Sequence, residues 1–211
     1  QNLITIQIFL ERNKMKQKLL RPITRLTAIL IWLVSSTYYV VADDLKVALA
    51  AEPTSMDPHY QNLTINNSFA TQIYNALVLQ DVNQNLIPGL ATSWKPVDDR
   101  TWEFTLRKNV KFHNGASFSA EDVIASMERA ANVPNSPSSF ATFTKGKKFV
   151  VVDDFTIRVS TEKPYPFTPN DMSRISIIDS AFLKATTEDF NTGVASYGTG
   201  PFTLTEWLPG D

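Results

Sequence analysis

Two stretches of this chain alternate between apolar and polar residues, each next to a pair of aspartates. One Asp-Asp pair separates residues 93–95 from 101–107, and a second divides the stretch 149–160. Asp favours tight turns, and a period of two residues places every second side chain on the same face of a strand. Both stretches are therefore predicted to be antiparallel β-hairpins. The residues predicted to share their buried faces are Trp102, Phe104, Leu106, Phe155, Ile157 and Val159.

Helical patterns are interspersed with these hairpins. Residues 64–80 repeat apolar side chains at spacings of three and four, which predicts an amphipathic helix. Residues 119–132 begin with a serine at an N-cap position and acidic residues in the first turn, and 186–190 predict a short capped helical turn. Short strands are predicted at 45–49 and 202–205. Helices and hairpins together indicate a mixed α/β fold and not a strictly alternating parallel one.

The beginning of the chain is predicted to direct export. A basic segment that starts at Met15 precedes a largely apolar run, 26–34, and small residues occupy the positions up to Ala42 that signal peptidase reads. The run is shorter than the roughly 20 residues of a membrane span. Residues 15–42 are therefore predicted to be a signal peptide, with an uncleaved anchor as the alternative. Residues 1–14 are predicted to be an upstream non-native or mistranslated segment, outside the fold.

Removal of residues 1–42 would leave an acidic domain. The whole chain has 20 Lys and Arg against 21 Asp and Glu. Residues 1–42 hold six of the basic residues and one of the acidic residues, which leaves 14 basic and 20 acidic residues in 43–211. Nucleic acid recognition requires clustered basic side chains, so no nucleic acid partner is expected. The cluster KGKK at 145–148 is predicted to be a solvated turn.

Side chains that carry catalysis or bind metals are sparse. The chain has no cysteine, which excludes disulfides, thiol catalysis, Cys-based zinc sites and lipid attachment through an N-terminal cysteine. Its two histidines, His59 and His113, lack a second ligand at metal-binding spacing, and His113 is predicted to have a structural, hydrogen-bonded role. No Gly-x-Ser-x-Gly motif is present. We therefore expect no catalytic residue, no metal and no cofactor.

Two glycines flank Thr199 near the end of the chain. Gly198 and Gly200 precede Pro201, whereas a dinucleotide fingerprint requires a third glycine that opens a helix, and a P-loop requires Gly-Lys-Ser/Thr. The segment is therefore not predicted to bind phosphate. Glycine permits sharp bends and close backbone approach. Two interpretations remain: a purely structural kink, or a kink that brings the Thr199 amide to a binding cleft.

Three segments together resemble one protein family. They are EPTSMDPH at 52–59, KFHNGASFSAEDV at 111–123 and YGTGPFTLTEWLPGD at 197–211. From about residue 45 to its end, the chain resembles family 5 of the bacterial extracellular solute-binding proteins, the peptide-, dipeptide- and nickel-binding receptors of ABC importers. The resemblance implies a periplasmic-binding-protein-like fold of type II, in which two lobes surround a cleft.

The resemblance also implies an organisation and a function. Residues 43–211 correspond to the N-terminal part of the first lobe, with an extra subdomain inserted at about 80–185, and the chain is expected to be truncated before the second lobe. The implied function is that of a periplasmic receptor that binds short peptides and delivers them to an ABC transporter permease in the inner membrane. Such a receptor performs no catalysis and is a monomer at full length.

The loops that match the family are expected to border the cleft. The expected solute-binding residues are Glu52, Pro53, Thr54, Ser55, Met56, Asp57, Tyr197, Gly198 and Thr199. Within this set, Glu52 and Asp57 could equally serve as turn or cap residues. Three alternatives stay open: the same receptor class for a nickel or other metal chelate, an opine or a sugar derivative; a secreted hydrolase; and a degenerate gene product that binds nothing.

Overall fold

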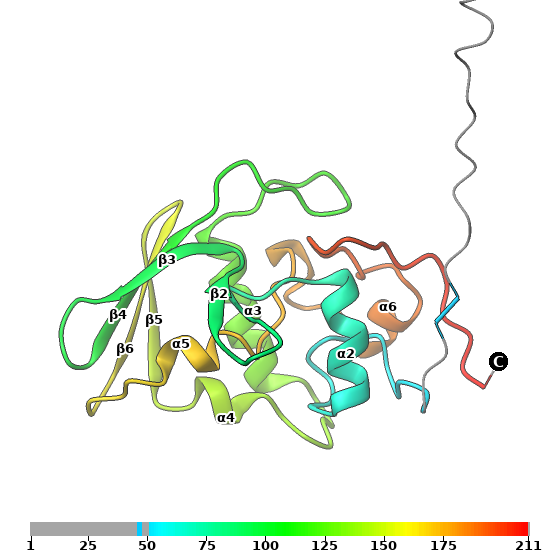
Figure 1. Ribbon diagram of the computed structural model, residues 1–211. Coiled ribbons are helices and arrows are strands. Elements are labelled where there is room, and N and C mark those ends of the chain that lie inside the picture. The colour runs from blue at the N-terminus through cyan, green and yellow to red at the C-terminus, as the bar shows by residue number, and fades with distance from the viewer. Residues whose placement is uncertain (1–45, 48–50, 211) are drawn as a thin grey trace, which may run out of the picture. The chain divides into compact units, whose positions relative to one another are not determined.

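The computed structural model describes residues 46–47 and 51–210 (Figure 1). The predicted upstream segment, the predicted signal peptide and most of the predicted strand at 45–49 lie outside the described residues. Residues 51–210 lie in one compact unit. Its helices and strands are α2 (Thr64–Ile73), β1 (Val78–Gln80), β2 (Leu86–Pro88), β3 (Ala91–Pro96), β4 (Thr101–Leu106), α3 (Ala120–Asn132), α4 (Ala141–Thr144), β5 (Lys147–Asp153), β6 (Thr156–Thr161), α5 (Thr168–Asp171), η1 (Ser180–Phe182) and α6 (Thr187–Asn191).

A four-stranded antiparallel sheet contains both predicted hairpins. Its strand order is β3-β4-β6-β5, so the two hairpins β3–β4 and β5–β6 are joined by pairing between β4 and β6. On the solvent-facing side, Glu103 lies 3.3 Å from the ammonium of Lys95 and 2.8 Å from the guanidinium of Arg158. The opposite face follows the predicted alternation. Its fully buried central residues are Phe104, Leu106, Ile157 and Val159.

Helix α3 packs against the buried face of this sheet. It begins directly after Ser119, whose backbone N–H donates to the carboxylate of Asp122 at 2.7 Å, as in a capping box. This confirms the helix that the sequence predicts at 119–132. The helix contributes its apolar stripe to a first core. That core includes Leu77, Phe104, Phe112, Val123, Met127, Phe140, Ile157 and Ile177.

A second, smaller core lies between α2 and α6, which Figure 1 shows side by side. The chain passes from this core to the first between Tyr74 and Leu77, and it returns between Ile177 and Ile178. At this crossing the N–H of Ile177 donates to the carbonyl oxygen of Asn75 at 2.9 Å. The buried residues of the second core are Ala70, Ile73, Tyr74, Ile178, Phe190 and Ala195.

The predicted helix at 64–80 is too long. Helix α2 ends at Ile73 because Tyr74 adopts an extended backbone conformation, and residues 78–80 form strand β1. Leu77 meets the helical spacing of the sequence by coincidence. It is fully buried in the first core, and its carbonyl oxygen accepts from backbone N–H groups near β3.

Two other local predictions need correction. The predicted strand at 202–205 is irregular, because its backbone has no ladder partner among the described residues. The cluster at 145–148 is only partly a solvated turn. Lys147 begins β5; its side chain is 5% exposed, and its ammonium lies 2.6 Å from the carboxylate of Asp171. The short helix at 186–190, by contrast, is confirmed as α6, with Thr186 as its cap.

Candidate functional site

The loop at 51–59 contains most of the predicted cleft residues, and the structure divides them into two groups. Glu52 and Thr54 are exposed. Glu52 Oε1 accepts from the N–H of Gly210 at 2.8 Å, and the Thr54 hydroxyl donates to Gln61 Oε1 at 2.7 Å. The second group is buried in the protein interior. Its members are Pro53, Ser55, Met56 and Asp57.

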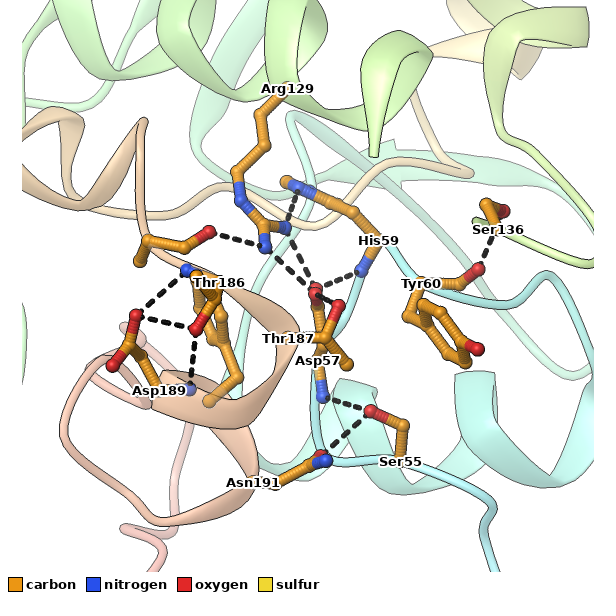
Figure 2. Close-up of polar contacts among 12 residues, drawn as sticks. Ser55, Asp57, His59, Tyr60, Arg129, Ser136, Thr186, Thr187, Asp189 and Asn191 are labelled. Atoms are coloured by element: carbon orange, nitrogen blue, oxygen red, sulfur yellow. Dashed lines mark hydrogen bonds and ion pairs between the residues drawn. The ribbon is translucent and has the colours of Figure 1, made fainter. Parts of the chain in front are cut away.

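Asp57 forms a buried ion pair with Arg129 of α3 (Figure 2). Both Nη atoms donate to the carboxylate, each at 2.7 Å, and the side chains of Asp57 and Arg129 are 0% and 5% exposed. The carboxylate also accepts from the backbone N–H of His59 and the hydroxyl of Thr187, each at 2.9 Å. Four donors therefore surround one buried negative charge and replace the water it has lost.

The imidazole of His59 lies against the same guanidinium. Arg129 Nη1 is 3.2 Å from Nδ1 of His59, and Nε2 is 2.8 Å from the carbonyl oxygen of Ser176. Because a guanidinium can only donate, Nδ1 accepts and the ring proton is on Nε2, which donates to Ser176. Burial and the positive charge of Arg129 lower the pKa of His59 to about 4. His59 is therefore neutral at neutral pH.

Arg129 holds a third segment as well. Its Nη2 donates to the carbonyl oxygen of Ala185 at 3.1 Å, and its guanidinium lies 4.3 Å from the ring centre of Phe190 in α6. Burial alone would raise the pKa of Asp57, but the hydrogen bonds and charge of Arg129 outweigh it and keep that pKa below its ordinary value. The pair is therefore fully ionised at neutral pH.

Further hydrogen bonds hold the 51–59 loop near Ser55 and at Tyr60, the residue that follows it. The side-chain oxygen of Asn191, in α6, accepts from the Ser55 hydroxyl at 2.7 Å and from the N–H of Met56 at 2.9 Å. At the other end, the Ser136 hydroxyl donates to the carbonyl oxygen of Tyr60 at 2.6 Å. Figure 2 shows the Ser55–Asn191 and Ser136–Tyr60 contacts around the ion pair. The loop is thus bound to α6, to α3 and to the loop after α3.

The glycine kink lies against the C-terminal end of α2. A Cβ on Gly198 would be 1.9 Å from the carbonyl oxygen of Ile73, and one on Gly200 would be 2.6 Å from that of Gln72. Behind the kink, His113 Nδ1 accepts from the N–H of Gly198 at 3.3 Å, and its Nε2 donates to the carbonyl oxygen of Gly200 at 2.9 Å. The predicted close backbone approach and the structural role of His113 are confirmed.

Tyr197 and Thr199 are half-buried. The Tyr197 ring packs on Phe182 with centroids 5.6 Å apart, and the Thr199 hydroxyl donates to Asn75 Oδ1 at 3.0 Å. No hydrogen bond between described residues joins the predicted group at 52–57 to that at 197–199.

In the described part of the chain, two cavities large enough for a small molecule lie near these segments. The larger, about 650 Å³, lies between the C-terminal end of α3 and residues 183–191, and its lining includes Tyr60, Arg129, Lys184, Glu188 and Asn191. The smaller, about 440 Å³, lies beside α2, and its lining includes Pro58, Asn67, Asn75, Arg174 and Ser176. Both volumes lie within the range of roughly 300–1,000 Å³ that is typical of small-molecule sites.

The predicted residues reach these cavities through their neighbours. Asn191, which contacts Met56, lines the larger cavity, and Asn75, which contacts Thr199, lines the smaller one. Among the nine predicted residues, none contributes to the lining of either cavity. Ser55, Met56 and Asp57 line a much smaller hollow against α2.

Sequence reasoning missed the residues that hold the loop. The signal for one of them is present in α3, where Asp122, Ser126 and Arg129 follow one another at spacings of four and three and so share one helix face. A polar stripe beside an apolar stripe usually faces solvent, but all three residues here are buried. The other missed residues, which carry no comparable pattern, are His59, Thr187 and Asn191.

The described residues contain neither a metal-binding group of side chains nor a helix able to span a membrane. Across residues 46–47 and 51–210, no three or more His, Asp or Glu side chains are grouped so that they could hold a metal ion. In the same part of the chain, no helix combines the length and apolar character needed to cross a membrane. The arrangement is one of hydrogen-bonding groups and internal ion pairs around two cavities.

Comparison with known proteins places this arrangement in a family. The model described as bacterial extracellular solute-binding proteins, family 5 Middle, matches residues 85–211, more than half of the chain. The glutathione-binding protein GsiB of Salmonella choleraesuis is 30% identical over 171 residues, which cover 80% of this chain and 33% of that protein. The probable D,D-dipeptide-binding periplasmic protein DdpA of Escherichia coli is 34% identical over 203 residues. The match covers 86% of this chain and 38% of that protein.

The fold is shared with solved structures. OppA of Burkholderia pseudomallei matches with a TM-score of 0.69 at 23% identity, over 77% of this chain and 36% of that one. This likeness confirms the predicted mixed α/β, periplasmic-binding-protein-like fold. The chain spans about a third of the length of the relatives it matches. Because the family model matches more than half of its residues, the chain belongs to the bacterial extracellular solute-binding proteins of family 5.

Proposed function

We propose that this chain is part of a periplasmic receptor of an ABC importer, which binds short peptides and delivers them to a permease in the inner membrane. The observation that carries the proposal is the alignment with two relatives that are named for binding glutathione and a D,D-dipeptide. These alignments cover 80% and 86% of this chain. A receptor of this kind closes two lobes on its solute and performs no catalysis.

The chain would supply part of the first lobe, with an inserted subdomain at about 80–185. The division of the apolar residues into two cores supports this organisation, because the chain crosses between them near 74–77 and 177–178. In the longer protein, a second lobe would follow. Binding free energy would come from hydrogen bonds to the solute and from its burial between the lobes.

The predicted cleft residues would act in two ways. Glu52 and Thr54, which are exposed, and Tyr197 and Thr199, which are half-buried, have atoms at the surface to contact a solute. The buried members of the set would instead hold the backbone of the loop. They are Pro53, Ser55, Met56, Asp57 and Gly198.

Location and assembly complete the proposal. Export by the segment 15–42 would deliver the protein to the periplasm, and the acidic balance of 43–211 supports the absence of a nucleic acid partner. The receptor would act as a monomer at full length, with the permease as its partner.

Calorimetric titration of the purified full-length protein tests this function. The panel would contain tri-alanine, Ala-Ala, glutathione, the nickel–histidine chelate, an opine and a disaccharide. We expect saturable binding of at least one peptide and unchanged peptide after incubation. Binding of the chelate, the opine or the sugar alone would reassign the solute class. Absence of binding to every member, or hydrolysis of a peptide, would contradict the proposal.

A further inference from the structure

The Asp57–Arg129 pair unites three segments that are far apart in the sequence. Arg129 comes from the middle part of the chain, in α3, and it contacts the 51–59 loop and the segment 185–190. The pair is buried, with side chains 0% and 5% exposed, and Arg129 borders the larger cavity. A buried ion pair is weak evidence for stability, since an apolar pair of similar volume is often as stable. Its presence therefore suggests a role in fixing geometry.

The geometry that the pair fixes is that of the loop between the cavities. Pro58, next to Asp57, lines the smaller cavity, and Tyr60 lines the larger one. Between them, His59 is held by its N–H on Asp57, by Nδ1 on Arg129 and by Nε2 on the Ser176 carbonyl. A shift of Asp57 would consequently move a wall of each cavity.

The bond pattern also explains why a guanidinium is needed. The two parallel 2.7 Å bonds to Asp57 are a fork–fork contact, while the bonds to His59 and Ala185 use further N–H directions of the same group. An ammonium is a compact donor without this planar fork. Lysine at position 129 would keep the charge but could not hold all three partners in one orientation.

We propose that Arg129 is a positioning residue for solute binding. It holds the 51–59 loop, together with the adjoining Tyr60, in the conformation that the solute requires. This inference rests on the proposed function. Arg129 borders the larger cavity, and its N–H groups are directed at Asp57, His59 and Ala185. Its effect passes through Asp57 and His59 to the residues beside the cavities, so that the loop is ordered before the solute arrives. Such preorganisation strengthens binding by reducing the entropy that is lost on association.

The test compares variants of the full-length protein. Arg129→Lys keeps the charge, and the double variant Asp57→Leu with Arg129→Met replaces the pair by apolar side chains. Arg158→Met is the matched control, because Arg158 also makes two bonds to a carboxylate, that of Glu103, but on the solvent-facing side of the sheet. Three quantities would be measured: the affinity for tri-alanine and glutathione, the unfolding midpoint, and amide hydrogen exchange in residues 55–62.

We expect Arg129→Lys to weaken peptide binding by about tenfold or more and to speed exchange in residues 55–62. The double variant leaves the N–H of His59 and the hydroxyl of Thr187 without their acceptor, so its unfolding midpoint should fall. At a temperature at which it is fully folded it should still bind as weakly as Arg129→Lys, which a merely stabilising pair would not produce. Arg158→Met should change neither affinity nor exchange. Wild-type affinity and exchange in Arg129→Lys, or wild-type affinity in the double variant, would overturn the inference.

Failure of the proposed function can be distinguished from failure of this inference. If the unaltered protein binds no peptide, the proposed function is wrong. Hydrogen exchange then still decides the role of Arg129: faster exchange in residues 55–62 of Arg129→Lys supports loop positioning, and unchanged exchange refutes it.

Discussion

His59 is the residue whose protonation would disturb the buried network most. Its ring is fully buried, and its Nδ1 accepts a bond from Arg129, so a proton there would face a guanidinium without water. Asp57 offers a compensating negative charge, but its carboxylate already accepts four hydrogen bonds. The network is therefore compatible only with a neutral imidazole and an ionised carboxylate.

This predicts a specific loss of stability in acid. The pKa of His59 falls from its ordinary value of 6.5 to about 4 on folding, so the unfolded state takes up a proton first as the pH decreases. The free energy of unfolding should consequently fall between pH 6.5 and 4, by up to about 3 kcal/mol. Denaturant unfolding at a series of pH values checks this. His59→Gln, which can still donate to Ser176, should remove most of the slope; an unchanged slope would refute the assignment.

The kink at 198–200 yields a second prediction at the residue scale. In Gly198→Ala the new Cβ would meet the Ile73 carbonyl oxygen at 1.9 Å, where backbone cannot easily move. We expect the free energy of unfolding to drop by about 3 kcal/mol or more. Gly115→Ala is the control, because Gly115 has a φ of +88° but open space around it, and it should cost only about 1 kcal/mol. Chemical denaturation measures both; equal losses would contradict the steric explanation.

Residue roles could be predicted where the sequence limits the choices. The glycines around Thr199 have few uses besides a bend or a close approach, and His113 has no metal-binding neighbour. Arg129 and Asp57 lie 72 positions apart, and their contact depends on how α3 packs, which no local pattern specifies.

At the scale of elements, α3 is the helix on which the unit depends. Its apolar stripe packs on the sheet, whereas its polar stripe faces the segment that returns to the second core. Asp122 accepts from the N–H of Ser180 at 2.8 Å, and the N–H of Ile178 donates to the Ser126 hydroxyl at 2.9 Å. The contact between α3 and residues 178–180, here termed the seam, thus uses side chains from one side of the helix.

Replacement of Asp122 by alanine tests this seam. The substitution removes the bond that caps α3 and leaves the N–H of Ser180 without its partner, so the free energy of unfolding should fall by about 3 kcal/mol. Glu121→Ala is the control, since Glu121 lies in the same helical turn but is exposed, and it should cost about 0.5 kcal/mol. Thermal and denaturant unfolding give both values. A small effect of Asp122→Ala would show that the seam has other support.

The sequence pattern correctly predicts those elements whose stabilising contacts lie within a few residues of one another. Both hairpins and α3 follow from alternation, turn residues and a cap within a few positions. The end of α2 does not, because its next turn is replaced by an extended segment that enters the first core. The strand expected at 202–205 fails for the opposite reason: alternation supplies a suitable side-chain pattern, but a strand also needs a partner.

At the scale of the whole molecule, the described unit exposes apolar side chains that a soluble domain would usually cover. Phe167, Phe202 and Leu208 are 60%, 55% and 55% exposed. Strand β5 is at an edge of the sheet and carries partly exposed valines at 150–152. Unpaired edges and apolar patches favour association. The chain spans about a third of the length of its relatives, and no local sequence pattern indicates which of these exposed side chains a longer protein would cover.

An isolated fragment of residues 43–211 is therefore expected to be marginally stable and prone to aggregation. Light scattering coupled to size exclusion, followed by denaturant unfolding of any monomer, measures this. The full-length protein is the control and should be monomeric. A monomeric fragment with a cooperative unfolding transition would show that the exposed surfaces do not limit folding.

The backbone bond between Ile177 and Asn75 has a practical consequence for engineering. The polypeptide leaves and re-enters the α2–α6 region at neighbouring points, so the segment between them has adjacent ends. Modules whose own termini are close together are the ones that tolerate such transplantation. Under the proposed function, a circularly permuted fluorescent protein inserted at this junction of the full-length protein is expected to report solute binding as a change in fluorescence.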